Sequence, residues 1–174
     1  METVDALALW QQFGPAYFRE LSTFGALPED VILSLLTNGR AIRLNKGEVL
    51  YSVGDKSESF FVVLSGTIDT NEERNGNRGA LVRRHRAGDD LGFVPMIALI
   101  DRPGSATAQT DSIVVEISSE QFLKLHQQNP DAFGLLLLNL ARGMARAVLK
   151  AGNTLAELRL QINAAYRTII GNKD

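Results

Sequence analysis

Few residues in this chain of 174 have the types and spacing that catalysis or metal binding requires. There is no cysteine, so disulfides, thiol catalysis and thiolate metal sites are excluded, as is usual in a reducing compartment. His85 and His126 are the only histidines, and neither has a second metal-type residue at the spacing of a zinc site. No histidine accompanies a serine and an acid, and no glycine-rich phosphate loop opens a long helix. The sequence therefore predicts that the chain is not an enzyme and holds no metal.

Charge and hydropathy argue against nucleic acid and against a bilayer. The net charge is −2, which gives no overall field to hold nucleic acid. A local basic cluster of Arg78, Arg83, Arg84 and Arg86 is most often a solvated strand face. The longest apolar run, Gly134 to Leu138, is far shorter than the roughly 20 residues that cross a bilayer, and no signal peptide is present. We therefore expect a cytoplasmic protein without nucleic-acid or membrane partners.

The composition is that of a soluble globular domain, with 45% hydrophobic and 22% charged residues. Apolar residues at interrupted helical spacing between residues 5 and 38 predict two or three short helices. Pro28, Glu29 and Asp30 form a helix start, because proline suits the first turn and acids suit the positive end of the dipole. We assign residues 1–40 to these amino-terminal helices.

Residues 41–118 carry the pattern of short strands. Runs of β-branched and aromatic residues are separated by glycine turns, which is typical of an antiparallel sandwich or barrel and not of βαβ units. The glycines have a physical reason, since tight turns need positive φ or close backbone approach. The expected strands are 41–44, 49–52, 60–65, 67–71, 81–86 and 113–116.

Helical spacing returns in residues 119–174. Ser119 caps a short helix through His126, and Pro130 with Asp131 opens a much longer one. Apolar residues in the long helix follow a 4-3 alternation, which is the seam of a coiled coil. The seam comprises Leu137, Met144, Val148, Leu155, Leu158 and Ile162, together with Ala141, Ala151, Ala165 and Ile169.

This seam is too long to be covered by the chain's own domain. A stripe of about 40 residues spans roughly 60 Å at 1.5 Å per residue, which exceeds the width of a domain of this size. The distal half therefore needs a partner, and we predict a parallel homodimer through residues 137–169. Gly152 and Asn153 could mark a kink or a hinge in this helix.

Several ordered motifs resemble the cyclic-nucleotide-binding domains of bacterial catabolite activators and protein-kinase regulatory subunits. Residues 46–51, 54–55 and 60–66 are similar to the first turns and strands of that family, and the resemblance covers about residues 20–150. Gly88-Asp89, Leu91-Gly92 and Ser105-Ala106-Thr107 resemble the borders of its phosphate-binding cassette. The resemblance implies an α+β fold: an antiparallel β-roll, or jelly roll, with short amino-terminal helices and a long carboxy-terminal dimerisation helix.

The resemblance implies a cyclic nucleotide as ligand, either cyclic AMP or cyclic GMP, but two charged contacts of the family are missing. Where the family has a glutamate for the ribose and an arginine for the phosphate, this chain has Phe93 and Gly104. Losing two such contacts weakens binding by roughly two to four decades. Arg102 could replace the cation or be a solvated loop residue.

The remaining cassette positions leave two readings open. Ser105 could donate to a phosphate, and Thr107 could do the same or simply lie in a strand. Phe93 and Met96 make the cassette more apolar than a phosphate site, which favours a filled pocket or another ligand. In the activator branch the long helix presents hydroxyls to the base, but the matching positions here are Ala151 and Gly152. The tentative cassette comprises Gly92, Phe93, Arg102, Gly104, Ser105, Ala106 and Thr107.

Two functions fit these observations. The first is a homodimeric regulatory module for signal transduction, without its own catalytic or DNA-binding domain, that senses a cyclic nucleotide or another small anion and could act on a separate output protein. The second is a degenerate, ligand-free dimeric scaffold that binds neither cyclic AMP nor cyclic GMP. The missing glutamate and arginine favour the second function. Only five residues follow the last seam residue, Ile169, so we expect no helix-turn-helix like that of the activators.

Overall fold

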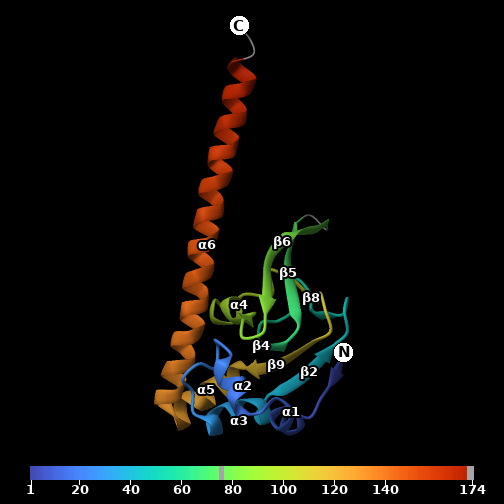
Figure 1. Cartoon of the computed structure of the whole chain (residues 1–174), viewed down its shortest axis with the longest axis vertical. Helices are drawn as coiled ribbons and strands as arrows, with labels where there is room; N and C mark the ends of the chain where they lie inside the picture. The colour runs from blue at the N-terminus through green and yellow to red at the C-terminus, as the bar shows by residue number, and fades with distance from the viewer. Residues whose placement is uncertain (75–76, 172–174) are drawn as a thin grey trace. The chain divides into compact units, whose positions relative to one another are not determined.

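The computed structural model describes the backbone of residues 1–74 and 77–171 and the side chains of residues 1–72 and 81–166. Its contacts divide the chain into two units, Met1–Leu140 and Ala141–Asp174. After the short strand β1 come three short helices, then a run of strands that includes the short helix α4, and then two further helices (Figure 1). This is the expected α+β class with antiparallel sheets, short amino-terminal helices and a long carboxy-terminal helix.

The first unit is built on two antiparallel sheets. The five-stranded sheet has the order β1-β2-β9-β4-β7, and the four-stranded sheet has the order β3-β8-β5-β6. The strands of the first sheet are β1 (Glu2–Thr3), β2 (Arg40–Leu44), β4 (Ser59–Ser65), β7 (Asp90–Leu91) and β9 (Ser112–Ser118). Those of the second are β3 (Val49–Tyr51), β5 (Thr67–Arg74), β6 (Asn77–Arg86) and β8 (Gly104–Ala108).

Most of these strands follow the predicted pattern, and the differences have local causes. The strand expected at 81–86 begins at Asn77, and the one expected at 67–71 extends to Arg74, because β5 and β6 form one long hairpin. Strand β8 was not predicted, since Gly104 to Ala108 contains only small residues and one threonine. It forms because it lies between β3 and β5, which supply its hydrogen bonds on both sides.

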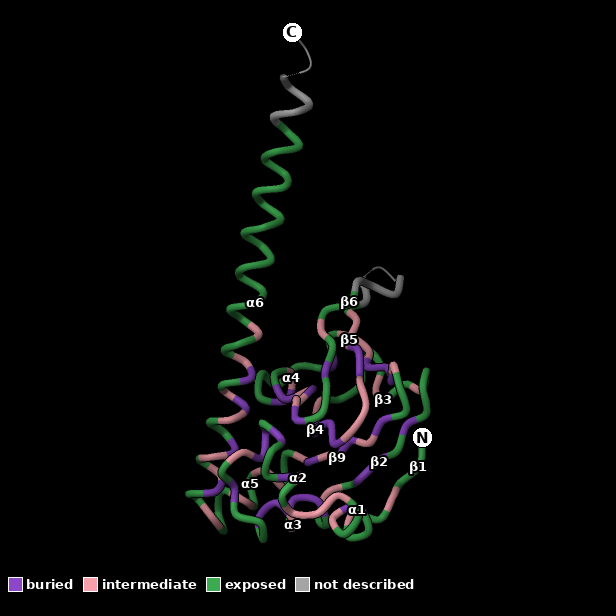
Figure 2. Tube along the Cα trace, in the orientation of Figure 1, coloured by how far each residue is buried: buried purple, intermediate pink, exposed green. Residues whose placement is uncertain are grey.

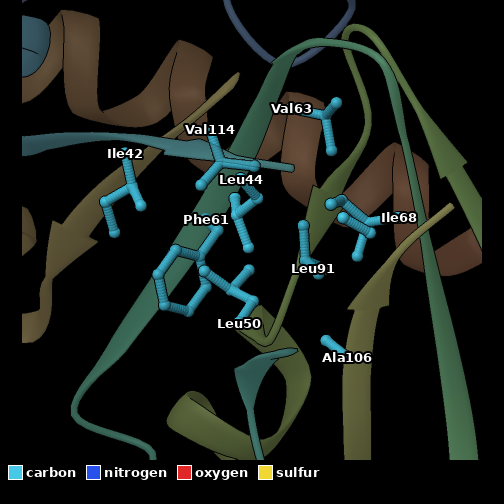
Figure 3. Packing of buried hydrophobic residues seen from close by; sticks show 10 residues of the cluster. Ile42, Leu44, Leu50, Phe61, Val63, Ile68, Leu91, Ala106 and Val114 are labelled. Carbon is cyan, nitrogen blue, oxygen red and sulfur yellow. The ribbon is translucent and has the colours of Figure 1, made fainter. Parts of the chain in front are cut away.

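The main core lies between the two sheets. Its buried side chains come from both of them, as Figure 3 shows for Phe61 of β4 facing Leu50 and for Ile68 of β5 beside Leu91. The cluster comprises Ile42, Leu44, Leu50, Phe61, Val63, Ile68, Leu91, Ala106, Ala108 and Val114. Burying such side chains is the dominant favourable term in folding, at roughly 25 cal/mol per Å² of apolar surface.

Strand β4 is buried on both faces, which explains its uninterrupted apolar run. Phe61 and Val63 face the core between the sheets, whereas Phe60 packs edge-to-face on Phe93 and Phe122 outside it. A strand covered on both sides needs no polar alternation. The covering layer consists of α1 (Ala6–Phe13), α2 (Pro15–Glu20), α3 (Glu29–Asn38), α4 (Phe93–Ile97) and α5 (Ser119–Gln128). Helix α3 contacts β2, α4 contacts β4 and α5 contacts β9.

Local signals in the sequence set the starts of these helices. Asp5 accepts a hydrogen bond from the Leu7 amide at the start of α1, at 2.8 Å. Ser118 and Gln121 form a reciprocal capping box at the start of α5, one residue before the cap that the sequence suggested. Pro28 is the residue that precedes the first turn of α3. Helix α4 was not predicted, because its five residues include valine, isoleucine and proline.

The last helix, α6, runs without a break from Pro130 to Gly171. Gly152 and Asn153, the possible kink or hinge, lie inside this continuous helix. Within the first unit, Ala132, Leu136 and Leu140 of α6 are buried. Asn139 also donates to the carbonyls of Thr23 and Gly25, at 3.2 and 2.7 Å. This face fixes the start of α6 to the domain.

Helix α6 bears on the expectation that the chain has no membrane partner, which stays a prediction. Pro130–Tyr166 contains an 18-residue window with a mean hydropathy of 1.4, which is long and apolar enough to cross a bilayer by length and composition. The longest uninterrupted apolar run did not indicate this window. Its dispersed alanines and leucines raise the mean hydropathy without forming a long run. One such helix is weak evidence for a membrane span, and only 22% of this window is buried inside the protein.

Candidate functional site

A cavity of about 320 Å³ opens beside the four-stranded sheet. We call it the β5–α4 cavity. Its apolar wall consists of Tyr51, Val82, Leu91, Val94, Pro95 and Pro103. Its polar wall consists of Thr70, Asn71 and Glu72 of β5 and Arg83 and His85 of β6. Gly92 and Gly104 complete the lining, so the cavity lies at the cassette that the sequence indicated, and its size is within the range of small-molecule sites.

Gly92 lines this cavity and also contacts the buried Arg102. Its φ of 78° is left-handed, and a Cβ there would overlap the Arg102 guanidinium. Glycine is therefore required both by the backbone conformation and by the close approach of Arg102. Its carbonyl accepts a hydrogen bond from Arg102 Nη1 at 2.9 Å.

Arg102 points into the interior and is not among the residues that line the cavity. Only 3% of it is exposed, so it is not a solvated loop arginine. Nη2 donates to the Ser59 carbonyl at 2.7 Å, and the guanidinium carbon lies 4.5 Å from the Tyr51 ring centroid. Burial lowers the pKa of Arg102 below its usual value, although Tyr51 opposes the change. The guanidinium therefore donates to two carbonyls and packs over an aromatic ring. In this arrangement it does not reach a ligand in the cavity.

Arg102→Met is expected to lower the free energy of unfolding by about 2–4 kcal/mol. The substitution keeps most of the volume but leaves the buried carbonyls of Gly92 and Ser59 without their donor. Urea unfolding measures the loss. The matched control is Arg86→Met on the exposed part of β6, which should change stability by less than about 0.5 kcal/mol. Equal effects of the two substitutions would contradict a structural role for Arg102.

His85 is a buried, neutral histidine in the polar wall. Its Nδ1 lies 2.9 Å from the Asp90 carbonyl, which can only accept, so this nitrogen carries the proton. Nε2 then accepts from the Thr70 hydroxyl at 3.2 Å. Burial, aided by the positive charge of Arg83 and opposed by Asp89, lowers the pKa of His85 to about 4. His85 therefore adds no positive charge to the cavity near neutral pH.

Stability should fall on acidification because of His85. The unfolded histidine titrates near 6.5 and the folded one near 4, so between these values the unfolded state binds the additional proton. The contribution is complete above pH 6.5 and is lost as the pH falls towards 4. Urea unfolding at pH 7 and pH 4.5 should show about 2–3 kcal/mol more loss in the wild type than in His85→Gln. The same loss in both proteins would refute this assignment.

Phe93 faces the core and not the cavity. It is fully buried, with Phe60 and Phe122 in edge-to-face contact at ring-centroid distances of 5.4 and 5.8 Å. From Phe93 and Met96 the sequence suggested either a filled pocket or another ligand. Both are buried in α4, neither lines the cavity, and the cavity stays open.

Strand β8 carries the other cassette residues. Gly104 lines the cavity and lies so close to β5 that a Cβ would overlap the backbone oxygen of Asn71. An arginine at this position is therefore incompatible with the strand pairing. Ala106 and Thr107 are buried in β8, and Ser105 accepts a hydrogen bond from the Val53 amide at 3.0 Å. Of the seven tentative cassette residues, the structure brings only Gly92 and Gly104 to the cavity wall.

Two of the four arginines in the basic cluster pair with neighbouring acids. Arg84 pairs with Asp69 through two 2.8 Å bonds, because the two residues lie opposite each other in the β5–β6 register. Arg83 pairs with Asp89 at 3.4 Å. Arg78 lies outside the described side chains. Arg83 and Arg84 are therefore each paired with a carboxylate of the same chain.

The rest of the described surface offers no stronger site. A hollow of similar volume lies between α3 and α5, but its lining is mainly polar and contains no cassette residue. Among the residues that the structure describes, no group of three His, Cys, Asp or Glu could hold a metal ion.

Sequence reasoning missed most of the cavity wall. Tyr51 of β3 and Thr70 of β5 lie far from the cassette in the sequence, whereas Arg83 and His85 of β6 lie shortly before it, and the pairing of the second sheet brings these strands together. One signal was present in the sequence, since His85 lies inside a predicted strand that ends shortly before the cassette.

Comparison with known proteins agrees with this geometry. The family model described as the cyclic nucleotide-binding domain matches residues 41–129, just over half of the chain. A lysophospholipase NTE1 from Cryptococcus neoformans is 32% identical over 106 residues, which cover 61% of this chain and 6% of that protein. The chain thus spans a small fraction of this curated relative, and what the two share is the cyclic nucleotide-binding domain.

Solved structures share the fold. A cyclic nucleotide-binding domain from Methylobacillus flagellatus has a TM-score of 0.76 and 13% identity, covering 90% of this chain and 88% of that one. The catabolite activator protein of Thermus thermophilus has a TM-score of 0.65 and 24% identity, covering 79% of this chain and 63% of that one. The family match, the two sheets and the cavity at the cassette agree, and the chain belongs to the cyclic nucleotide-binding domain family.

Proposed function

We propose that this chain is a regulatory module that works as a homodimer through α6. A ligand in the β5–α4 cavity would shift the equilibrium between two conformations of the dimer. The observation that carries this proposal is the combination of the family's domain with an apolar stripe on α6 that has no cover in the monomer.

The exposed stripe on α6 supports the dimer. Val148, Leu155, Leu158 and Ile162 are 70%, 68%, 47% and 56% exposed, and all lie on the 4-3 seam. Figure 2 shows exposure along the distal part of the helix. Large apolar patches of this kind are rare on monomers and mark interaction surfaces. The four stripe residues all lie beyond Leu140, the last large apolar residue of α6 that is buried in the first unit, so one helix can serve its own domain and a partner.

Light scattering of the chain at micromolar concentration tests the proposal. We expect twice the mass of the 19.0 kDa chain. A monomer at this concentration would contradict the homodimer.

A ligand-free scaffold is the second candidate. The inward Arg102 and the buried Phe93 favour it, because neither serves a nucleotide. The open cavity of about 320 Å³ favours a module that takes a ligand. A site that had lost its ligand would be filled by packed side chains. We therefore place the regulatory module first.

A further inference from the structure

We propose that the β5–α4 cavity takes an uncharged, largely apolar small molecule and not a nucleotide or another anion. This inference rests on the proposed function in one respect, because it treats the cavity as the input site of the module. It goes further by assigning the chemical class of the ligand from the cavity wall.

Among the lining residues whose side chains the structure describes, one acid and one permanent cation carry charge, namely Glu72 and Arg83. These described residues therefore give the wall no net positive charge. Arg83 also pairs with Asp89, and His85 is neutral. An anion that entered this cavity would lose its hydration without gaining a committed counter-charge, which is costly.

Arg102 does not supply a cation to the cavity. Its guanidinium is the charge nearest to the cassette glycine, but its bonds to Gly92 and Ser59 aim it into the interior. Turning it towards the cavity would leave both carbonyls without this donor.

The apolar side of the cavity matches a flat hydrophobic ligand. Val82 and Val94 are 65% and 51% exposed at the cavity, and Pro95, Pro103 and Tyr51 continue the same surface. Thr70 and Asn71 of β5 also line the cavity and can orient one polar group of the ligand. Ligand sites commonly combine such an apolar lining with a few polar groups.

Two fluorescent probes of the same skeleton test the charge preference. N-phenylnaphthylamine is uncharged, and anilinonaphthalenesulfonate adds one sulfonate to the same rings. We expect the wild-type chain to bind the uncharged probe at least about tenfold more tightly than the sulfonate, equivalent to about 1.4 kcal/mol. Equal or tighter binding of the sulfonate, or displacement of the uncharged probe by cyclic AMP, would overturn the proposal.

A matched pair of variants locates the bound probe. Val82→Asp with Val94→Asp places two carboxylates on the cavity wall and should weaken binding of the uncharged probe at least about tenfold. Leu81→Asp with Ile97→Asp changes residues of 51% and 47% exposure on the same two elements that do not line the cavity. This control should stay within about twofold of the wild type. An equal loss in both variants would overturn the assignment to the cavity.

The exposed seam of α6 is the other apolar surface that the probe could bind. Binding that survives the cavity variant but disappears in Leu155→Asp with Leu158→Asp would place the probe on α6 and overturn the inference. The experiments distinguish failure of the ligand proposal from failure of the dimer proposal. A dimeric chain that does not bind the uncharged probe refutes the ligand class alone, whereas a monomeric chain that binds it in the cavity refutes the dimer alone.

Discussion

Phe93→Glu is expected to lower the free energy of unfolding by about 4–6 kcal/mol. The substitution removes a fully buried ring from the cluster with Phe60 and Phe122, which by itself costs about 3–5 kcal/mol. It also places a carboxylate where the aromatic rings offer it no counter-charge. Urea unfolding followed by circular dichroism measures the effect. The loss is comparable to the whole stability of many domains, so part of the protein should be unfolded without urea.

The neighbouring residue provides the control for this prediction. Val94→Glu introduces the same carboxylate one residue later, at a position that is 51% exposed, and should cost less than about 1 kcal/mol. Similar losses for both variants would show that Phe93 does not form the core contact seen here.

The same reasoning decides what happens when the family's two charged residues are introduced together. Phe93→Glu with Gly104→Arg should destabilise the protein and give no gain in cyclic AMP affinity, because a Cβ at Gly104 overlaps the Asn71 backbone. Calorimetry with cyclic AMP checks the second part. A stable double variant with micromolar affinity would instead indicate that only the charges of a nucleotide site were lost.

Leu155→Asp with Leu158→Asp should convert the homodimer into a monomer. Both leucines lie on the seam and are exposed in the single chain, so a dimer would bury them against each other. Four carboxylates at the centre of that seam would be desolvated and would repel one another. Light scattering should show the mass falling from twice the 19.0 kDa chain to that of one chain.

A matched pair of leucines on α6 controls for general effects of the substitution. Leu149 and Leu160 are both 69% exposed but lie outside the 4-3 spacing. Leu149→Asp with Leu160→Asp should therefore leave the mass unchanged. If this control also dissociated the protein, the interface would not follow the predicted seam.

The class of fold was largely predictable because local chemistry specifies it. Glycine turns between β-branched runs indicated β2, β4, β5 and β9, and the 4-3 alternation indicated α6. Strand β8 and helix α4 were not predictable in this way. Gly104 to Ala108 has little intrinsic strand preference and becomes a strand only between β3 and β5, while α4 is held by burial of Phe93 and Met96.

The tertiary structure alone showed which side chains line the cavity at the cassette. The sequence located the cassette and showed that Phe93 and Gly104 replace the charged residues of the family. It left open whether Arg102 reaches a ligand, because the direction of a side chain depends on distant partners. Here the carbonyl of Ser59 and the ring of Tyr51 draw the guanidinium inward. Cross-strand pairing of Asp69 with Arg84 likewise neutralises a charge that the sequence presents as free, since register and not sequence distance sets which charges meet.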